Sequence, residues 1–269
     1  WIYDLDLTSL YPSIIMTLNI SPETKIGKIA DWDANKFVKG EVDTYYIGDN
    51  TISKENLRKY LDDSKFSVAS NGVLYRTDTV GCIPGILDLW FQKRVEYKDE
   101  MMKYGKAGDD DKYAFFHKRQ LVQKILLNSL YGVLGLPAFR FYDVDNATAV
   151  TTTGQTVIKS TADMANIKYN KELNTPDLDS NIYIDTDSVF FSAVPLMDKR
   201  FPNWKDEEQD VIAGYVNDIA EEMQDYLNDF YDILSTKVLN VDKDKHRLEI
   251  KKEYVAKAGL WVAKKRYAQ

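Results

Sequence analysis

The sequence contains a single cysteine, Cys82, among 269 residues. One cysteine excludes an intrachain disulfide, and it fits either a reducing compartment or an inert buried thiol. The sequence also lacks an apolar run long enough to span a bilayer, and no signal peptide opens it. We therefore expect no membrane partner and a cytoplasmic location.

Acidic residues outnumber basic ones: the sequence has 42 Asp and Glu and 35 Lys and Arg, which gives a net charge of −7. That balance is weak evidence against a stand-alone nucleic-acid-binding protein. The charge is local, however, since acids gather at 206–210 and 218–232 and bases gather at the C-terminus. With 44% hydrophobic residues, the chain can bury the core of one large or two modest domains.

Two aspartates, Asp185 and Asp187, lie between apolar and aromatic stretches in residues 181–192. The flanks predict two short buried strands, and Asp-Thr-Asp-Ser predicts the hairpin turn that joins them. Neighbouring carboxylates repel each other and raise each other's pKa unless a cation lies between them. A solvated turn is the commoner explanation of an isolated Asp-x-Asp, so the interpretation depends on a second carboxylate site.

The second carboxylate is Asp6, which ends an apolar strand before a turn at 9–13 and a helix from Ile14. Asp6 and Asp187 could hold Mg²⁺, a hard ion bound incompletely by protein together with substrate phosphates. Two such ions about 3.5–4 Å apart would activate a hydroxyl and stabilise a leaving oxygen, and Mn²⁺ could replace them. Asp4 lies on the same strand face as Asp6, and we expect it to be solvent-exposed and without a role.

Three segments in order carry a resemblance to a known family. Residues 6–13, 124–132 and 183–188 resemble motifs A, B and C of family B (α-like) DNA polymerases. The longer stretch 128–135 is most similar to the replicative polymerases of tailed phages. Residues 264–267, Lys-Lys-Arg-Tyr, match the family's template–primer contact motif.

The resemblance implies an α+β fold, in which a polymerase palm of antiparallel sheet on helices, with a ferredoxin-like core, carries an inserted helical-hairpin fingers subdomain. Residues 1–83 would form the first part of the palm, 84–134 the fingers and 135–269 the second part. The proofreading exonuclease and the thumb of the family would then be supplied by other regions of the same or a separate chain. A virus-infected bacterial cell is the expected setting.

The resemblance also implies the reaction, in which a primer 3′-hydroxyl attacks the α-phosphate of a templated dNTP. Its metal ligands would be Asp6, Asp187 and the Leu7 carbonyl, with Asp185 as an auxiliary ligand. Lys124 would act with the carboxylates by offsetting charge on the departing pyrophosphate. Primer–template DNA and dNTPs are the expected partners, and a sliding clamp is a further candidate.

The resemblance assigns further residues to the two substrates. Nucleotide contacts would come from the amides of Ser9 and Leu10, from the steric gate Tyr11, and from Arg94, Lys98, Lys124 and Asn128. DNA contacts would come from Tyr131, Gly132, Lys264, Lys265, Arg266 and Tyr267. Glu253 falls where the family can carry an acid near the metals.

Several elements follow from residue patterns alone. Apolar periodicity and breakers predict a helical hairpin over 84–135 with its tip at 105–111, and an amphipathic helix over 206–236. We also expect a short helix at 53–60, a turn at 70–72, a strand at 139–142, a long helix beginning at 151–155, and a strand over 246–254 with Leu248 and Ile250 inward.

Other interpretations remain open at this stage. Tyr11 could be a core aromatic, and Arg94, Lys98 and Lys124 could belong to an ordinary basic amphipathic helix pair. The chain could be a catalytically silent, polymerase-like binding or scaffold module. A reverse transcriptase or RNA polymerase is disfavoured by Tyr11 and the Asp-Thr-Asp centre, and a two-metal nuclease would not need the helix that carries Lys124 and Asn128.

Overall fold

The computed structural model describes residues 1–268, which divide into two compact units. The first unit contains residues 1–10, 154–234 and the chain from 248 onward. The second unit contains residues 11–153 and 235–247. Within residues 1–268, no helix has the length and apolar composition needed to cross a membrane.

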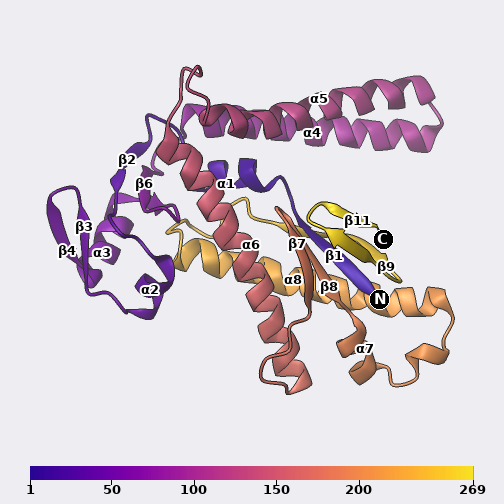
Figure 1. Cartoon of the computed structure of the whole chain (residues 1–269). Coiled ribbons are helices and arrows are strands. Elements are labelled where there is room, and N and C mark those ends of the chain that lie inside the picture. The colour runs from indigo at the N-terminus through magenta and orange to yellow at the C-terminus, as the bar shows by residue number, and fades with distance from the viewer. Residues whose placement is uncertain (269) are drawn as a thin grey trace. The chain divides into compact units, whose positions relative to one another are not determined.

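The first unit is built on a four-stranded antiparallel sheet in the order β7-β8-β1-β9 (Figure 1). Its strands are β1 (Ile2–Leu7), β7 (Asn181–Asp185), β8 (Ser188–Ser192) and β9 (Ile250–Ala256). The order places the strand from the start of the chain between strands from its second half. The predicted hairpin around Asp185 and Asp187 is thereby confirmed as β7 and β8. The prediction that both strands are buried is wrong for β7, because β7 lies at the edge of the sheet and its Ile182 is 40% exposed.

Alternation along β1 separates the two faces of this sheet. Tyr3, Leu5 and Leu7 are at most 1% exposed and form the core side, whereas Asp4 and Asp6 point to the opposite side. Paired residues in adjacent strands share a face, so Phe190 lies beside Asp4 and Ser188 beside Asp6. One face is therefore a hydrophobic core and the other carries carboxylates.

Two long helices contribute to the core of this unit, α6 (Val144–Leu173) and α8 (Gln209–Lys237). The part of α6 from Gly154 onward and the part of α8 up to Leu234 belong to this unit. Tyr3 Oη lies 3.0 Å from Tyr169 Oη on α6, and Thr161 Oγ1 lies 2.7 Å from Tyr231 Oη on α8. These buried hydroxyls satisfy one another, so they add specificity to an otherwise apolar core. The short elements α7 (Val194–Arg200) and η1 (Trp204–Asp206) connect β8 to α8.

The C-terminal hairpin of the first unit consists of β10 (Leu260–Ala263) and β11 (Arg266–Ala268). Trp261 and Tyr267 pack against Phe190, with ring centroids 5.9 and 5.4 Å away. Since Phe190 is the cross-strand partner of Asp4, this hairpin covers part of the carboxylate face.

The second unit contains the remaining helices and strands. Its sheets have the orders β2-β6-β5 and β3-β4. Their strands are β2 (Lys25–Lys28), β3 (Thr44–Ile47), β4 (Asn50–Ser53), β5 (Phe66–Val68) and β6 (Val73–Arg76). They pack with α2 (Ala34–Lys39) and α3 (Lys54–Ser64) on a core that includes Ile29, Phe37, Leu57 and Leu74. The predicted turn at 70–72 is confirmed, with Gly72 at φ 84.

Helices α4 (Cys82–Ala107) and α5 (Asp110–Leu134) form the predicted helical hairpin, and they run side by side in Figure 1. Gly108 caps α4 in the left-handed conformation, and the Asp109 side chain accepts a hydrogen bond from the Lys112 amide at the start of α5. The predicted tip was too long, because α4 continues through Ala107. Helix α1 (Leu10–Leu18) precedes this region.

The strand predicted at 139–142 is wrong. Residues 137–141 form successive turns, in which the Phe139 amide donates to the Leu136 carbonyl and the Tyr142 amide to the Phe139 carbonyl. These bonds are local, so the aromatic run does not pair with a strand. Helix α6 also begins at Val144, before the predicted 151–155, where the Asp143 side chain caps it by accepting a hydrogen bond from the Asn146 amide at 3.1 Å.

Smaller corrections concern other boundaries and one thiol. Helix α3 runs from Lys54 to Ser64 with Ser53 as its N-cap, and α8 begins at Gln209. Strand β9 begins at Ile250 rather than at 246, although Leu248 and Ile250 are buried as predicted. Cys82 is exposed, so the alternative of a buried thiol is wrong.

The buried tyrosine pair gives a stability prediction. Tyr169→Phe should lower the free energy of unfolding by about 1–3 kcal/mol, because Tyr3 and the Ser192 carbonyl each lose a buried partner. Urea unfolding followed by circular dichroism measures this change. Tyr142→Phe is the matched control, since Tyr142 is 42% exposed. Equal stability of the two variants would show that the pair contributes nothing.

Candidate active site

Asp6 and Asp187 are brought together by backbone pairing in the first unit. The Leu7 amide donates to the Asp187 carbonyl at 2.8 Å, immediately after Asp6. Ser188 Oγ donates to Asp6 Oδ2 at 2.9 Å and fixes that carboxylate from the neighbouring strand. The turn that carries Asp187 is therefore bonded directly to the end of β1.

Three turns at this site contain a non-glycine residue in the left-handed conformation. They are Ser9 (φ 48) after β1, Thr186 (φ 58) between β7 and β8, and Lys265 (φ 62) between β10 and β11. Such backbone is uncommon for residues with a side chain and tends to occur at functional sites. Each turn lies within or beside a segment predicted to contact a substrate or metal.

Asp185 lies beside the C-terminal hairpin. Lys265 Nζ is 3.7 Å from Asp185 Oδ1, and the Lys265 amide donates to Tyr183 Oη at 2.9 Å. The Asp185 side chain is 16% exposed, so this ion pair is partly shielded from water. Lys265 thus contacts Asp185, which the sequence did not predict.

The expectation that Asp4 is exposed is wrong. Asp4 is 5% exposed, and the pKa of its carboxyl is raised to about 7, mainly by burial and also by the negative charges of Asp6, Glu253 and Asp187. The sequence shows that Asp4 and Asp6 share a strand face. The burial of Asp4 could not be predicted, because it depends on the strands and aromatic rings around Asp4.

The donors at this site suit a hard cation. Carboxylate and carbonyl oxygens are the ligands that Mg²⁺ prefers, and Asp4 Oδ1 is buried with no hydrogen-bond partner within residues 1–268. In the same range, no three His, Cys, Asp or Glu side chains already form a metal cluster. The arrangement fits an ion held by one or two carboxylates that keeps several waters.

The predicted DNA-contact motif at the C-terminal hairpin is exposed. Lys264, Lys265, Arg266 and Tyr267 all lie on the surface, on or next to β11. Partial burial and the acids Asp185 and Asp4 raise the pKa of Tyr267. The phenol therefore remains neutral beside these carboxylates, while three cationic side chains extend nearby.

The second unit holds the predicted gate and fingers residues. Tyr11 and Tyr131 pack with ring centroids 4.4 Å apart, which joins motif A to motif B. Both side chains are half-buried, so Tyr11 is not a fully enclosed core residue.

The predicted cations lie on the α4–α5 hairpin. Lys98 on α4 and Lys124 and Asn128 on α5 are exposed, as is Gly132 near the end of α5. Arg94 is half-buried, and burial lowers the pKa of its guanidinium. Arginine stays protonated in proteins, so it still presents a positive charge.

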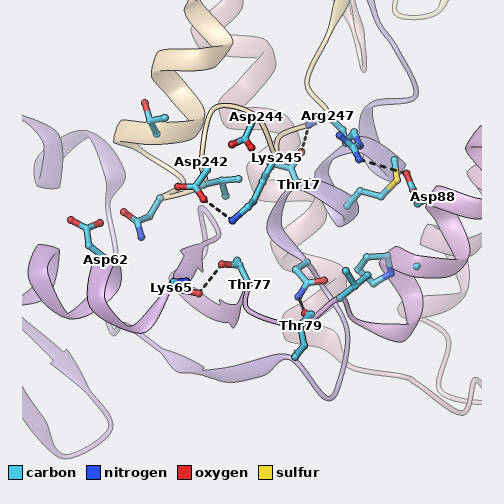
Figure 2. Close-up of a pocket in the computed structure, with 18 residues that line it drawn as sticks. Thr17, Asp62, Lys65, Thr77, Thr79, Asp88, Asp242, Asp244, Lys245 and Arg247 are labelled. Atoms are coloured by element: carbon cyan, nitrogen blue, oxygen red, sulfur yellow. Dashed lines mark hydrogen bonds and ion pairs between the residues drawn. The ribbon is translucent and has the colours of Figure 1, made fainter.

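A cavity of about 540 Å³ also lies in the second unit, but it contains none of the predicted site residues (Figure 2). It is lined by four aspartates and three basic side chains. Lys245 pairs with Asp242 at 2.6 Å, and Arg247 with Asp88 at 3.7 Å. An excess of acids with partly paired bases disfavours a triphosphate, so this cavity is not the candidate nucleotide site.

Sequence reasoning missed Ser188 and Tyr183, which hold Asp6 and the Lys265 backbone respectively. The sequence shows that both residues lie close to the carboxylates along their strands. It does not show the cross-strand register that makes them hydrogen-bond partners.

Comparison with known proteins identifies the family. A family model described as DNA polymerase family B matches residues 1–200. A DNA-directed DNA polymerase of Enterobacteria phage T4 is 29% identical over 329 aligned positions, which cover 100% of this chain and 34% of that protein. The corresponding polymerase of Escherichia phage RB69 is 27% identical over 247 positions, covering 74% and 26%.

A solved structure shows the same fold. The family B DNA polymerase from the hyperthermophilic archaeon Pyrobaculum calidifontis matches with a TM-score of 0.54 and 22% identity, over 99% of this chain and 25% of that one. The chain thus spans 34% or less of the length of each of these three relatives. Since the family model matches 200 of 269 residues, the chain belongs to DNA polymerase family B.

Proposed function

We propose that this chain carries the nucleotidyl-transfer core of a template-directed DNA polymerase, of the kind found in tailed phages. Its substrates are a primer–template duplex and dNTPs. The observation that carries the proposal is the backbone bond from Leu7 to Asp187, which joins motif A to motif C beside Asp6. Family membership supports the same chemistry.

Asp6, Asp187 and the Leu7 carbonyl would hold two Mg²⁺ ions, which when bound activate the primer hydroxyl and stabilise the leaving oxygen. Ser188 orients Asp6 through its hydrogen bond to Oδ2. Asp185 is an auxiliary carboxylate that forms an ion pair with Lys265. Glu253 lies near enough to Asp4 that its negative charge helps to raise the pKa of the Asp4 carboxyl.

The nucleotide triphosphate would be bound by fixed cations and amides. Arg94, Lys98 and Lys124 lie on two packed helices, and cations on rigid elements stabilise a developing pyrophosphate charge. The amides of Ser9 and Leu10, at the start of α1, suit an anion, and Asn128 lies one turn after Lys124.

Tyr11 is the proposed sugar gate, since its ring would collide with a 2′-hydroxyl. Tyr131 supports that ring through their 4.4 Å packing, and Gly132 beside it leaves room for a base pair. The exposed Lys264, Lys265 and Arg266 would contact duplex phosphates, which positions DNA without reading its sequence.

The proposed layout assigns residues 1–83 and 135–269 to the palm and 84–134 to the fingers. The exonuclease and thumb regions of such a polymerase, and a sliding clamp, are its proposed partners. The proposed setting is the cytoplasm of an infected bacterium.

Removal of Asp187 tests the reaction. Asp187→Ala should reduce single-nucleotide primer extension with Mg²⁺ by about 10²–10³-fold or more, because a charge that stabilises the transition state is lost. Duplex binding, measured by fluorescence anisotropy, should change little. Asp177→Ala is the control, since Asp177 is an exposed acid of the same unit.

The same assay separates the alternatives. Templated addition by the unmodified chain that is lost in Asp187→Ala supports the polymerase core. Tight duplex binding without addition contradicts it and favours a catalytically silent binding module. Equal loss of binding and extension in Asp187→Ala points to misfolding, which circular dichroism would reveal.

Substitution of the gate tests sugar selection. Tyr11→Ala should raise rNTP incorporation relative to dNTP incorporation by about tenfold or more, because a steric clash of over 1.4 kcal/mol is removed. Tyr11→Phe keeps the ring and should retain the original ratio. An unchanged rNTP/dNTP ratio in Tyr11→Ala would show that Tyr11 is only a packing residue.

A further inference from the structure

The first turn of α4 is capped by side chains from a distant segment. Its N-cap residue, Gly81, has no side chain, and Pro84 in the same turn has no amide hydrogen. Amides at the start of a helix have no acceptor within that helix, so other groups must satisfy them. Here the acceptors come from residues 19–25, the anchor segment, which joins α1 to β2.

Three polar side chains of the anchor segment accept hydrogen bonds from this turn. The pairs are the Gly81 amide with Asn19 Oδ1 at 2.8 Å, the Cys82 amide with Glu23 Oε1, and the Ile83 amide with Ser21 Oγ at 3.4 Å. Ser21 Oγ donates in turn to Glu23 Oε2 at 2.6 Å. A carboxylate at the N-terminus of a helix also interacts favourably with the helix dipole. The anchor segment therefore satisfies the amides with which α4 begins.

Asn19 also fixes the chain that leads into α4. Its side-chain nitrogen donates to the Arg76 carbonyl at 2.7 Å and to the Thr79 carbonyl at 2.8 Å. Asn19 is 8% exposed and has a left-handed backbone (φ 60), which asparagine adopts more readily than most residues. A Cβ on Gly81 would lie 2.7 Å from Ser21 Cβ, so the two segments are in close contact. The start of α4 is therefore held from several sides.

The same segment holds the other end of the helical hairpin. Lys25 Nζ lies 2.9 Å from Asp143 Oδ2 and 3.0 Å from Asp145 Oδ2. The Asp143 amide donates to the carbonyl of Leu134, the last residue of α5, at 3.2 Å. The Lys25 side chain is 24% exposed, so these ion pairs are partly shielded from water. The anchor segment thus binds the chain before α4 and the chain after α5.

We propose that the anchor segment positions the hairpin cations that bind the triphosphate, and that Asn19 and Lys25 are the positioning residues. This proposal rests on the proposed function, which assigns Arg94, Lys98 and Lys124 to that group. Asn19 and Lys25 act through the hairpin, because their side chains bond to its two ends.

The length of α4 makes its first turn important for the nucleotide. Gly81 and Arg94 are about 20 Å apart along the helix, at about 1.5 Å per residue. A small tilt of the first turn therefore becomes a displacement of an ångström or more at Arg94. A misplacement of about 1 Å, caused far from the chemistry, can lower a rate by about 10²-fold.

The orientation of the hairpin can be measured without activity. Spin labels at Thr51→Cys in β4 and Lys106→Cys in α4, in a Cys82→Ser background, report the distance between two exposed positions of the second unit. Double electron–electron resonance should give one narrow distance distribution for this labelled chain. Asn19→Ala and Lys25→Ala should broaden or shift it, because bonds at the ends of the hairpin are lost.

Asn240→Ala is the matched control for Asn19→Ala. Asn240 also has a left-handed backbone (φ 53), and its side-chain nitrogen donates to the Phe66 carbonyl at 2.8 Å in the same unit. Its partners lie on α3 and β5, so Asn240→Ala should lower the Tm but leave the distance distribution unchanged. Lys25→Arg keeps the positive charge and should retain the original distribution. The Lys25 variants keep the test valid if Asn19→Ala fails to fold.

Single-nucleotide primer extension at varied dNTP concentration connects the anchor segment to the reaction. Asn19→Ala and Lys25→Ala should raise the KM for dNTP by about tenfold or more, because displaced cations bind the triphosphate less well. Loss of folded protein alone would lower the apparent kcat and leave KM unchanged. Asn240→Ala and Lys25→Arg should therefore keep the KM of the unmodified chain.

The outcomes separate this proposal from the proposed function. Distance distributions or KM values in Asn19→Ala and Lys25→Ala that match those of the unmodified chain would overturn the positioning role. Equal changes of KM in Asn19→Ala and Asn240→Ala would overturn it as well. If the unmodified chain adds no dNTP, the proposed function is wrong, and the distance distributions alone then decide whether residues 19–25 fix the hairpin.

Discussion

The antiparallel pairing of β1 with β8 is the constraint on which the site depends. It fixes the register in which Asp6 lies opposite Ser188, and it ends with the bond from the Leu7 amide to the Asp187 carbonyl. Asp6 and Asp187 are far apart in the sequence, so local structure alone cannot bring them together. A shift of one residue in this register would move every side chain of β1 to the other face.

The same strand joins stability to chemistry. Its core face, with Tyr3, Leu5 and Leu7, is anchored by the tyrosine pair with Tyr169. Its other face concentrates carboxylates, which repel one another and would destabilise a sheet without compensation. Packing on the core face therefore offsets the repulsion between the carboxylates on the other face. Carboxylates held close together in this way suit a cation-binding site.

Partner charges around this face come from distant segments. Lys265 reaches Asp185 from the C-terminal hairpin, while Trp261 and Tyr267 enclose Phe190 next to Asp4. The positive charges that we propose for binding a triphosphate lie instead on the α4–α5 hairpin, where Lys98 and Lys124 are exposed. The net charge of −7 thus hides two local groups of opposite sign.

The sequence by itself determined the strand before Asp6, the hairpin around Asp185, the long helices and the family, because period, turn residues and motif spacing are local properties. Tertiary structure decided the burial of Asp4, the Ser188–Asp6 bond and the Lys265–Asp185 pair. Each of these depends on register or on side chains far along the chain. Asp4 shows the reason most directly: alternation predicts its face, but its burial depends on the neighbouring strand β8 and on the rings of the C-terminal hairpin that pack on Phe190.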